Sequence, residues 1–330
     1  MSDNSLGLIK LRLSALGTIA LVLSASTLFF AIILSFVGIG LLGMVGFVVF
    51  FNILQWLFAP KLINRMYKTK EVTKRDDPQL YGIVERLSRR MDLKMPKVME
   101  AKLPIANAFA YGSPLTGNLV AVTTGLRKEL NEGEVESVIG HELGHLKNKD
   151  VQAMVFLSVL PSIFYFIGFS LMLSSMFRGG LGGRGSGGGA GGMIVIGLLS
   201  MIMYWLLTIL ILGYSRTREY YADRRSVMVV DDGGKKLRSA LAKIVASSGR
   251  FKISKKDHGA MKFDGFKALF ISDPDRSTRD EVSLHRAKLI YDEQLVNKII
   301  ARKLTISDRL VELLSTHPNL VKRLRALQKL

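Results

Sequence analysis

The sequence predicts an integral membrane protein that is mainly α-helical, with four transmembrane helices and a polar part that carries a small β-sheet. Two observations lead to this fold class. Residues 14–60, 151–177 and 193–214 contain no charged side chain. The segments between and after these stretches show helical periodicity or strand-like alternation of apolar residues.

Residues 14–60 are long enough for two membrane spans. At 1.5 Å per residue, a helix of this length covers roughly twice the ~30 Å hydrocarbon core of a bilayer. Both a signal peptide and a buried soluble helix have a much shorter apolar stretch. We therefore expect a transmembrane hairpin in residues 1–60, followed by a polar part in residues 61–150.

Two further spans are predicted in residues 151–214, before a second polar part in residues 215–330. They are joined by "RGGLGGRGSGGGAGG", whose composition is typical of a flexible linker. Lysine and arginine cluster at residues 10–12, 61–75 and 216–225, whereas the linker holds only two arginines. By the positive-inside rule, both termini and both polar parts face the cytosol, as in a multi-pass protein of the cytoplasmic (inner) cell membrane.

The charge balance is strongly basic, with 46 Lys and Arg against 27 Asp and Glu and a net charge of +19. Such an excess indicates nucleic acid or an anionic membrane surface as partner, and the apolar stretches favour the lipid bilayer over nucleic acid. Cysteine is absent. Disulfides, iron–sulfur clusters and thiolate zinc sites are therefore excluded, and any metal must be held by His, Asp or Glu.

The first polar part reads as a mixture of helices and strands. Residues 77–93 have helical spacing, and residues 97–112 and 118–126 resemble two strands joined by the turn "SPLTG". Asn131 and Glu134 have the spacing of a capping box that opens another helix. The second polar part is mostly helical by pattern, most clearly at residues 235–247 and 317–330.

The helix that follows Asn131 contains the motif His141-Glu142-x-x-His145. Imidazoles one helical turn apart can converge on one zinc ion, and Glu142 then projects toward the reactive side of that ion. The alternative is a pair of surface histidines on a polar helix face. The motif alone has only moderate specificity.

A catalytic zinc usually needs a third protein ligand. "SRTREYYADRRS" supplies Glu219 and, one turn later, Asp223, whose carboxylate could accept the outer N–H of a ligating histidine. The alternative is that both acids only balance the arginines around them on a solvated helix. Because the two segments flank the second pair of spans, the sequence predicts one zinc site per chain at the cytosolic rim of a membrane bundle.

Taken together, these motifs resemble the HtpX-type membrane zinc metallopeptidases, which are related to the CAAX prenyl endopeptidases. The resemblance covers nearly the whole chain and includes "NAFAYG", "GLRKELNEGEVESVIGHELGHLKNKD", "SRTREYYADRRS" and "STHPNLVKRL". It implies a cytosolic α+β zincin-like metalloprotease domain formed by the two polar parts. Residues 251–302 depart most from the family pattern, so their role is open.

The resemblance also implies roles for individual residues. The zinc ligands would be His141, His145 and Glu219, with Glu142 as catalytic base. Asp223 would hold a ligating histidine. Asn107 matches a family position near the substrate cleft, with a plain strand-end amide as the alternative. His317 and Arg323 match a late H-P-x-x-x-x-R element that could stabilise the oxyanion or hold the cleft, with a plain helix N-terminal motif as the alternative.

The implied function is that of a zinc metalloendopeptidase. It would cleave unfolded, misfolded or damaged membrane proteins at the cytosolic face, in quality control linked to the stress response. Two alternatives are a non-catalytic zinc-containing membrane adaptor and a prenyl-protein endopeptidase, although the latter relatives have more spans. The sequence leaves natural substrates, cleavage specificity, regulation and oligomeric state open.

Overall fold

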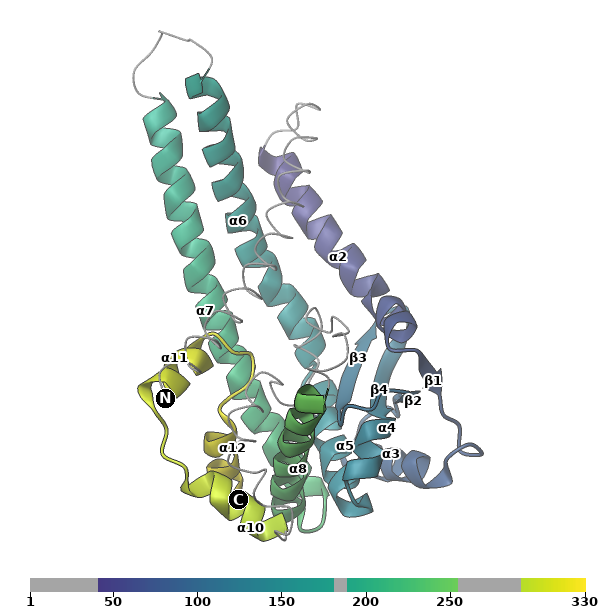
Figure 1. Ribbon diagram of the computed structural model, residues 1–330. Coiled ribbons are helices and arrows are strands. Elements are labelled where there is room, and N and C mark those ends of the chain that lie inside the picture. The colour runs from purple at the N-terminus through teal and green to yellow at the C-terminus, as the bar shows by residue number, and fades with distance from the viewer. Residues whose placement is uncertain (1–40, 181–188, 255–291) are drawn as a thin grey trace. The chain divides into compact units, whose positions relative to one another are not determined.

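The computed structural model describes residues 41–180, 189–254 and 292–330, which are mainly helical and include one four-stranded sheet (Figure 1). The chain divides into two compact units. The first comprises Met1–Ile53 and Phe156–Leu210, and the second comprises Leu54–Val155 and Ile211–Leu330. The predicted four-part division at residues 60, 150 and 214 stays a prediction.

Three helices in the described residues are long and apolar enough to cross a membrane: α2 (Leu41–Met66), α6 (Asp150–Gly180) and α7 (Gly189–Val229). The prediction of a helical membrane protein with a small sheet is thereby confirmed. The fourth predicted span falls in the first half of residues 14–60 and lies outside the described residues, as does much of residues 251–302.

In the first unit, glycines bring α6 and α7 into backbone contact. A methyl group at Gly168 would lie 2.9 Å from the Gly197 carbonyl oxygen, and one at Gly197 would lie 3.2 Å from the Gly168 oxygen. Small residues at such crossings are typical of helix pairs in membranes. Large apolar side chains such as Phe156 and Leu206 lie on the outside, as expected for surfaces that face lipid.

The second unit is built around a mixed sheet. Its strands are β1 (Thr69–Glu71), β2 (Lys97–Ala101), β3 (Ala108–Ser113) and β4 (Gly117–Thr123), in the order β1-β2-β4-β3. Strands β2 and β4 are parallel, and the other two pairs are antiparallel. Strand β3 therefore lies at one edge of the sheet, with one row of backbone groups directed away from β4.

The strand prediction was partly wrong. Residues 97–112 form two strands, because residues 102–107 leave the sheet to place β3 on the far side of β4. Residues 124–126 do not extend β4, because the Thr123 hydroxyl accepts a hydrogen bond from the Leu126 amide and starts α4 (Thr124–Glu129). Gly125 permits this turn, since a Cβ there would lie 2.3 Å from the Pro104 carbonyl oxygen.

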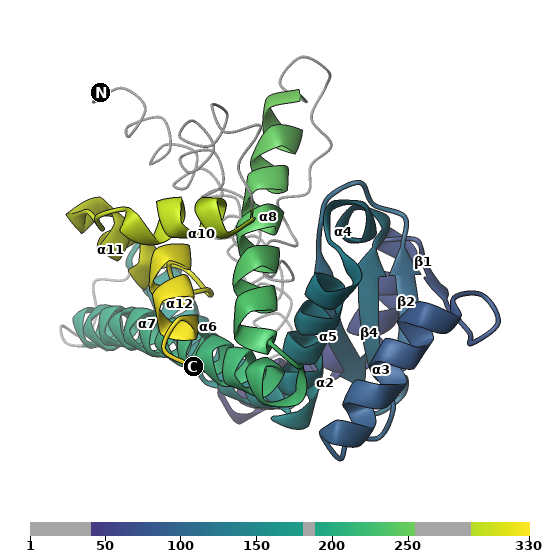
Figure 2. The same cartoon turned by 90° about the horizontal axis from the view of Figure 1, so that it is seen from below.

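The remaining helices of the second unit are α3 (Pro78–Arg90), α5 (Glu132–Lys147), α8 (Gly233–Ser254), α10 (Asp292–Ala301), α11 (Ile306–Leu313) and α12 (Leu320–Leu327). The main core lies between α3, α5 and one face of the sheet and continues between α5 and α8 (Figure 2), with Val120, Val138 and Leu241 fully buried. On the other face, Phe109 and Tyr111 pack with the end of α2.

Helix α5 begins as the sequence predicts. The Asn131 side chain accepts a hydrogen bond from the Glu134 amide at 2.9 Å, and the Glu134 carboxylate accepts one from the Asn131 amide at 2.9 Å. Glu134 also receives hydrogen bonds from Ser239 and Lys243 on α8. This buried carboxylate therefore fixes both the start of α5 and the position of α8 beside it.

Candidate metal centre

Helices α5 and α7 approach each other closely at two glycines of the H-E-x-x-H helix. A Cβ at Gly144 would lie 3.2 Å from the Ala222 Cα, and a Cβ at Gly140 would lie 3.0 Å from the Ser226 hydroxyl oxygen. Because both glycines lack a side chain, His141 and His145 reach the face of α7 that carries Glu219. The close approach of the two backbones thus brings the histidines and the third ligand, Glu219, together.

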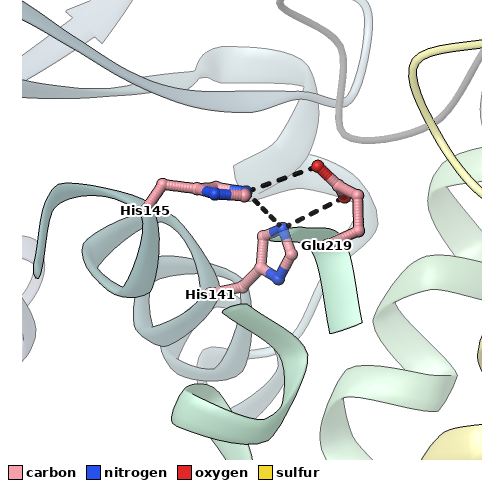
Figure 3. Close-up of side chains that lie close together, drawn as sticks. All are labelled: His141, His145 and Glu219. Carbon is pink, nitrogen blue, oxygen red and sulfur yellow. Dashed lines mark hydrogen bonds and ion pairs between the residues drawn. The ribbon is translucent and has the colours of Figure 1, made fainter. Parts of the chain in front are cut away.

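The three predicted ligand side chains converge. Figure 3 shows the imidazoles of His141 and His145, both from α5, directed toward the Glu219 carboxylate of α7. The two Nε2 atoms lie 3.2 Å apart, and they lie 3.6 and 3.5 Å from the nearer Glu219 oxygens. Ligands held tetrahedrally at ~2.0–2.1 Å from zinc lie about 3.3–3.4 Å apart, so the spacing fits such an ion.

Both alternatives that make these residues ordinary surface groups are contradicted. His141 is fully buried, and Glu219 and Asp223 are 3 % and 2 % exposed. An ionised carboxylate is stable at such burial only with a partner of opposite charge or several hydrogen-bond donors.

Each histidine is oriented by a carboxylate on its outer nitrogen. His141 Nδ1 lies 2.9 Å from Asp223 Oδ1, and His145 Nδ1 lies 2.6 Å from Asp150 Oδ2. When each Nδ1–H donates to its carboxylate, both Nε2 lone pairs point into the same small space. Sequence motifs indicate Asp223 but not Asp150, which stands five residues after His145 where α5 ends and α6 begins.

The site lacks positive charge. The buried carboxylates of Glu142, Asp150, Glu219 and Asp223 carry four negative charges if ionised. Arg323, and Arg218 at 3.8 Å from Asp150, supply two positive charges, which leaves the charge that a divalent cation would balance. Glu219 Oε2 is also buried without a hydrogen-bond partner among the described residues. Two imidazole lone pairs, a buried carboxylate and this charge deficit fit zinc.

Arg323 holds the acids of α7 from the opposite side. Its Nε and Nη2 donate to the two Asp223 oxygens at 2.7 and 2.6 Å, and its Nη1 lies 3.1 Å from Glu219 Oε2. Arg323 Nη2 is also 3.2 Å from both ring nitrogens of His141. The two ring nitrogens point in different directions, so one Arg323 nitrogen cannot donate a well-aligned hydrogen bond to both. The contact between Arg323 Nη2 and the His141 ring is therefore a packing contact.

His317 lies at the other side of Glu219, with its Nδ1 3.2 Å from Glu219 Oε2. Neither ring nitrogen of His317 has a hydrogen-bond partner in the described part of the chain, although both are buried. The late H-P-x-x-x-x-R element thus reaches the site at both of its ends. The alternative of a plain helix N-terminal motif does not account for these contacts, because the N-cap of α12 is Asn319.

Without a metal, the surrounding carboxylates favour the protonated form of His141. Burial and the positive charge of Arg323 lower the pKa of His141, but interactions with the Asp223 and Glu219 carboxylates outweigh both and raise it to about 9. A metal ion must displace that proton to bind.

Glu142 connects the site to the edge strand. Its Oε2 accepts a hydrogen bond from the Ala110 amide of β3 at 2.9 Å. Burial raises the pKa of Glu142, and the neighbouring His141 and His145 lower it to a smaller extent. A carboxyl group in this setting takes up a proton more readily than an exposed one, as a general base requires.

Asn107 is buried just before β3 and joins β3 to β4. Its amide donates to the Thr123 hydroxyl at 2.9 Å, and its carbonyl accepts from the Thr123 amide at 3.0 Å. The alternation of an antiparallel pair then directs the amides of Ala108, Ala110 and Gly112 away from β4. The backbone of Asn107 therefore sets which groups the edge strand presents.

Comparison with known proteins identifies the family. A model of peptidase family M48 matches residues 74–330. The chain belongs to peptidase family M48. A protease HtpX homologue from Thermoplasma acidophilum is 34 % identical over 282 residues, 84 % of this chain and 82 % of that protein. A protease HtpX homologue 2 from Sulfurisphaera tokodaii is 33 % identical over 336 residues and 97 % of each chain.

The crystal structure of S. mikatae Ste24p has the same fold, with a TM-score of 0.54 and 17 % identity over 98 % of this chain and 67 % of that chain. The chain is thus an HtpX-like membrane metalloprotease of family M48, a zinc-dependent family. The grouping of His141, His145 and Glu219 is the metal site that this membership leads one to expect.

The glycine contact between α5 and α7 leads to a prediction for this M48 chain. Gly144→Val would force the helices apart, and we expect a loss of about 1–3 kcal/mol of stability together with most of the bound zinc. Zinc per chain and the midpoint of thermal unfolding in detergent measure both effects. The matched control is Gly82→Val on α3, where a Cβ meets nothing within 4 Å. Wild-type zinc content in Gly144→Val would contradict the prediction.

The position of Asp150 leads to a second prediction, on zinc affinity. Asp150→Asn removes the charged acceptor of the His145 ring, and we expect zinc affinity to fall roughly 10–100-fold, as for other carboxylates that hold a ligating histidine. Competition with a chromophoric chelator measures this affinity. Asp231→Asn is the control, because the Asp231 side chain is exposed. An unchanged affinity in Asp150→Asn would show that His145 needs no orientation by this carboxylate.

Proposed function

We propose that this chain is a zinc-dependent endopeptidase of the cytoplasmic membrane that cleaves misfolded or damaged membrane proteins at the cytosolic face. One observation carries the proposal. The buried Glu142 carboxylate lies between a convergent His141, His145 and Glu219 set and the edge strand β3. A zinc-containing adaptor without activity would not need a carboxylate at that position.

His141, His145 and Glu219 would hold the zinc ion. Bound there, zinc supplies Lewis-acid chemistry that polarises the carbonyl of a peptide bond. The protein contributes orientation. Asp223 and Asp150 fix the two imidazoles, and Arg323 fixes Asp223, so that the ligand atoms are in place before the ion binds.

Glu142 is the proposed general base and acid. Its Oε2 is occupied by the Ala110 amide, so Oε1 is the oxygen that takes a proton from the attacking water and returns it to the leaving amine. No covalent intermediate between the substrate and the protein forms in this reaction. His317, whose ring nitrogens have no hydrogen-bond partner in the described residues, is placed to donate to the carbonyl oxygen as negative charge develops there.

Strand β3 is the proposed substrate platform. An extended peptide can pair with the outward carbonyls of β3 and with the amides of Ala108 and Gly112, and pass directly over Glu142, which the Ala110 amide holds. Such pairing reads the backbone of a substrate more than its side chains. The site would therefore accept many unfolded sequences, as quality control requires.

The chain itself links this site to the membrane. Helix α6 starts five residues after His145, and Glu219 comes four residues after Ser215, the last residue of an uncharged stretch on α7. A segment of a membrane protein that emerges from the bilayer would meet the site at once. The clusters of Lys and Arg beside the spans support a cytosolic position for it.

Purified wild-type chain in lipid vesicles tests the proposal. We expect it to degrade an unfolded membrane protein, to lose this activity when a chelator removes zinc, and to regain it when zinc is returned. A chain that binds zinc stoichiometrically but cleaves nothing would support the adaptor instead. Cleavage confined to a prenylated C-terminal peptide would support the prenyl-protein endopeptidase.

A further inference from the structure

Helix α11 (Ile306–Leu313) is amphipathic in the opposite sense to a surface helix of a soluble protein. Its acidic residues, Asp308 and Glu312, are buried. Its large apolar residues are exposed: Ile306 by 78 %, Leu310 by 63 %, Leu313 by 44 %, and the adjoining Leu314 by 49 %. The spacing of these four side chains at i, i+4, i+7 and i+8 places them on one face. We call them the apolar face of α11.

The buried side of α11 is held by specific polar contacts, so its orientation is fixed. Asp308 caps the helix at Thr305 and lies 3.2 Å from Arg302 Nη2. Glu312 accepts a hydrogen bond from Lys322 at 2.5 Å and one from the Asn319 amide at 3.1 Å. The helix cannot turn its apolar face inward without breaking these contacts.

The end of α11 is fastened to α7 just after the uncharged stretch of that helix ends. Arg216 Nη1 donates to the carbonyl oxygens of Glu312, Leu313 and Ser315 at 2.8, 3.0 and 2.9 Å. Arg216 is the first charged residue after the uncharged residues 193–215. The exposed Tyr214 two residues earlier is of the type that gathers at the membrane–water interface.

The charges that α11 presents outward fit an anionic lipid surface. Its exposed charged residue is Arg309, and Lys303 just before the helix is also exposed. Because both acidic side chains are buried, the outward surface is apolar and basic. Helices that lie in the headgroup region of a bilayer have this combination of an apolar face and flanking Lys or Arg.

We infer that α11 lies in the plane of the cytosolic membrane surface, with its apolar face among the lipid headgroups and upper acyl chains. The contacts of Arg216 place the helix at that depth, and the apolar face supplies the surface that lipid would cover. The inference goes beyond the proposed protease activity and does not depend on it.

Such docking would also restrain the metal centre. The chain runs from the end of α11 through Ser315 to His317, whose Nδ1 lies 3.2 Å from Glu219, and on to α12, which carries Arg323. The Glu312 carboxylate of α11 accepts a hydrogen bond from the backbone amide of Asn319, the N-cap residue of α12. A helix fixed at the bilayer therefore holds both ends of the late H-P-x-x-x-x-R element.

Site-directed labelling tests the inference, because the chain has no cysteine and one introduced thiol is unique. Leu310→Cys and Leu314→Cys carry a bimane fluorophore in vesicles of phosphatidylcholine and phosphatidylglycerol. Leu206→Cys, exposed on the span of α7, is the lipid reference, and Gln328→Cys, exposed at the end of α12, is the water reference. Zinc content equal to wild type shows that each labelled variant is folded.

We expect spin-labelled lipid to quench the labels on Leu310→Cys and Leu314→Cys several-fold more strongly than the label on Gln328→Cys. Iodide in the buffer should quench them several-fold less. Quenching at α11 equal to that at Gln328→Cys would overturn the inference by showing that the apolar face lies in water. Shielding from both quenchers would overturn it as well, because a protein surface would then cover the helix.

Discussion

Glu142→Gln should slow proteolysis by roughly 10²–10⁴-fold, the usual contribution of a positioned general base, while the purified protein keeps one zinc per chain. The amide is nearly isosteric with the carboxylate and can still accept the Ala110 hydrogen bond on its oxygen. It cannot take up a proton from water. The His141 and His145 rings and Glu219 are untouched, so the site should still bind metal.

Two measurements on the same preparation check this result: elemental analysis for zinc, and the initial rate of cleavage of an unfolded membrane protein in vesicles. Glu132→Gln is the matched control, because Glu132 is an exposed glutamate in the first turn of the same helix. It should keep both zinc and rate. Normal cleavage by Glu142→Gln would exclude Glu142 as the base, and loss of zinc would assign it a structural role.

The centre of this site could be predicted from sequence because its parts are local. The spacing of His141 and His145 is set by one helical turn, and Asn131 with Glu134 marks where that helix starts. The third ligand, Glu219, could be found as well, because Glu219 and Asp223 stand one turn apart near the end of an apolar stretch. In each case two residues close in sequence carry the information.

What sequence could not supply are contacts between distant segments. The hydrogen bond from Ala110 to Glu142 joins residues 32 apart and depends on β3 lying at the sheet edge. That strand order follows from a chain crossing at residues 102–107, which no periodicity reveals. Asp150 was missed for a different reason. It resembles an ordinary helix N-terminal acid, and only the packed structure turns it toward His145.

Arg323 is the most consequential of the distant contacts, because it balances two buried acids that stand 100 and 104 positions earlier in the chain (323 − 223 and 323 − 219). Burial would disfavour its charge, but the attraction of Asp223 and Glu219 is larger and raises its pKa. Arg323→Met would leave these carboxylates without their cation in the metal-free protein. We expect the stability of that form to fall by about 3–5 kcal/mol.

For a unit of this size, such a loss lowers the midpoint of thermal unfolding by roughly 10 °C. The matched control is Arg325→Met on the same helix, where an exposed guanidinium donates to the Ile300 and Arg302 carbonyl oxygens. It should change the midpoint little. Arg323→Lys should rescue only part of the loss, because an ammonium group cannot span both oxygens of Asp223 as the guanidinium does.

A double variant separates charge from packing. In Arg323→Met with Asp223→Asn, the unpaired negative charge of Asp223 is gone, so the combined loss should be smaller than the sum of the two single losses. Added zinc should reduce the effect of Arg323→Met further, because the bound ion supplies positive charge to the same carboxylates. If the two losses simply add and zinc changes neither, Arg323 acts through packing alone and does not balance the charge of the metal site.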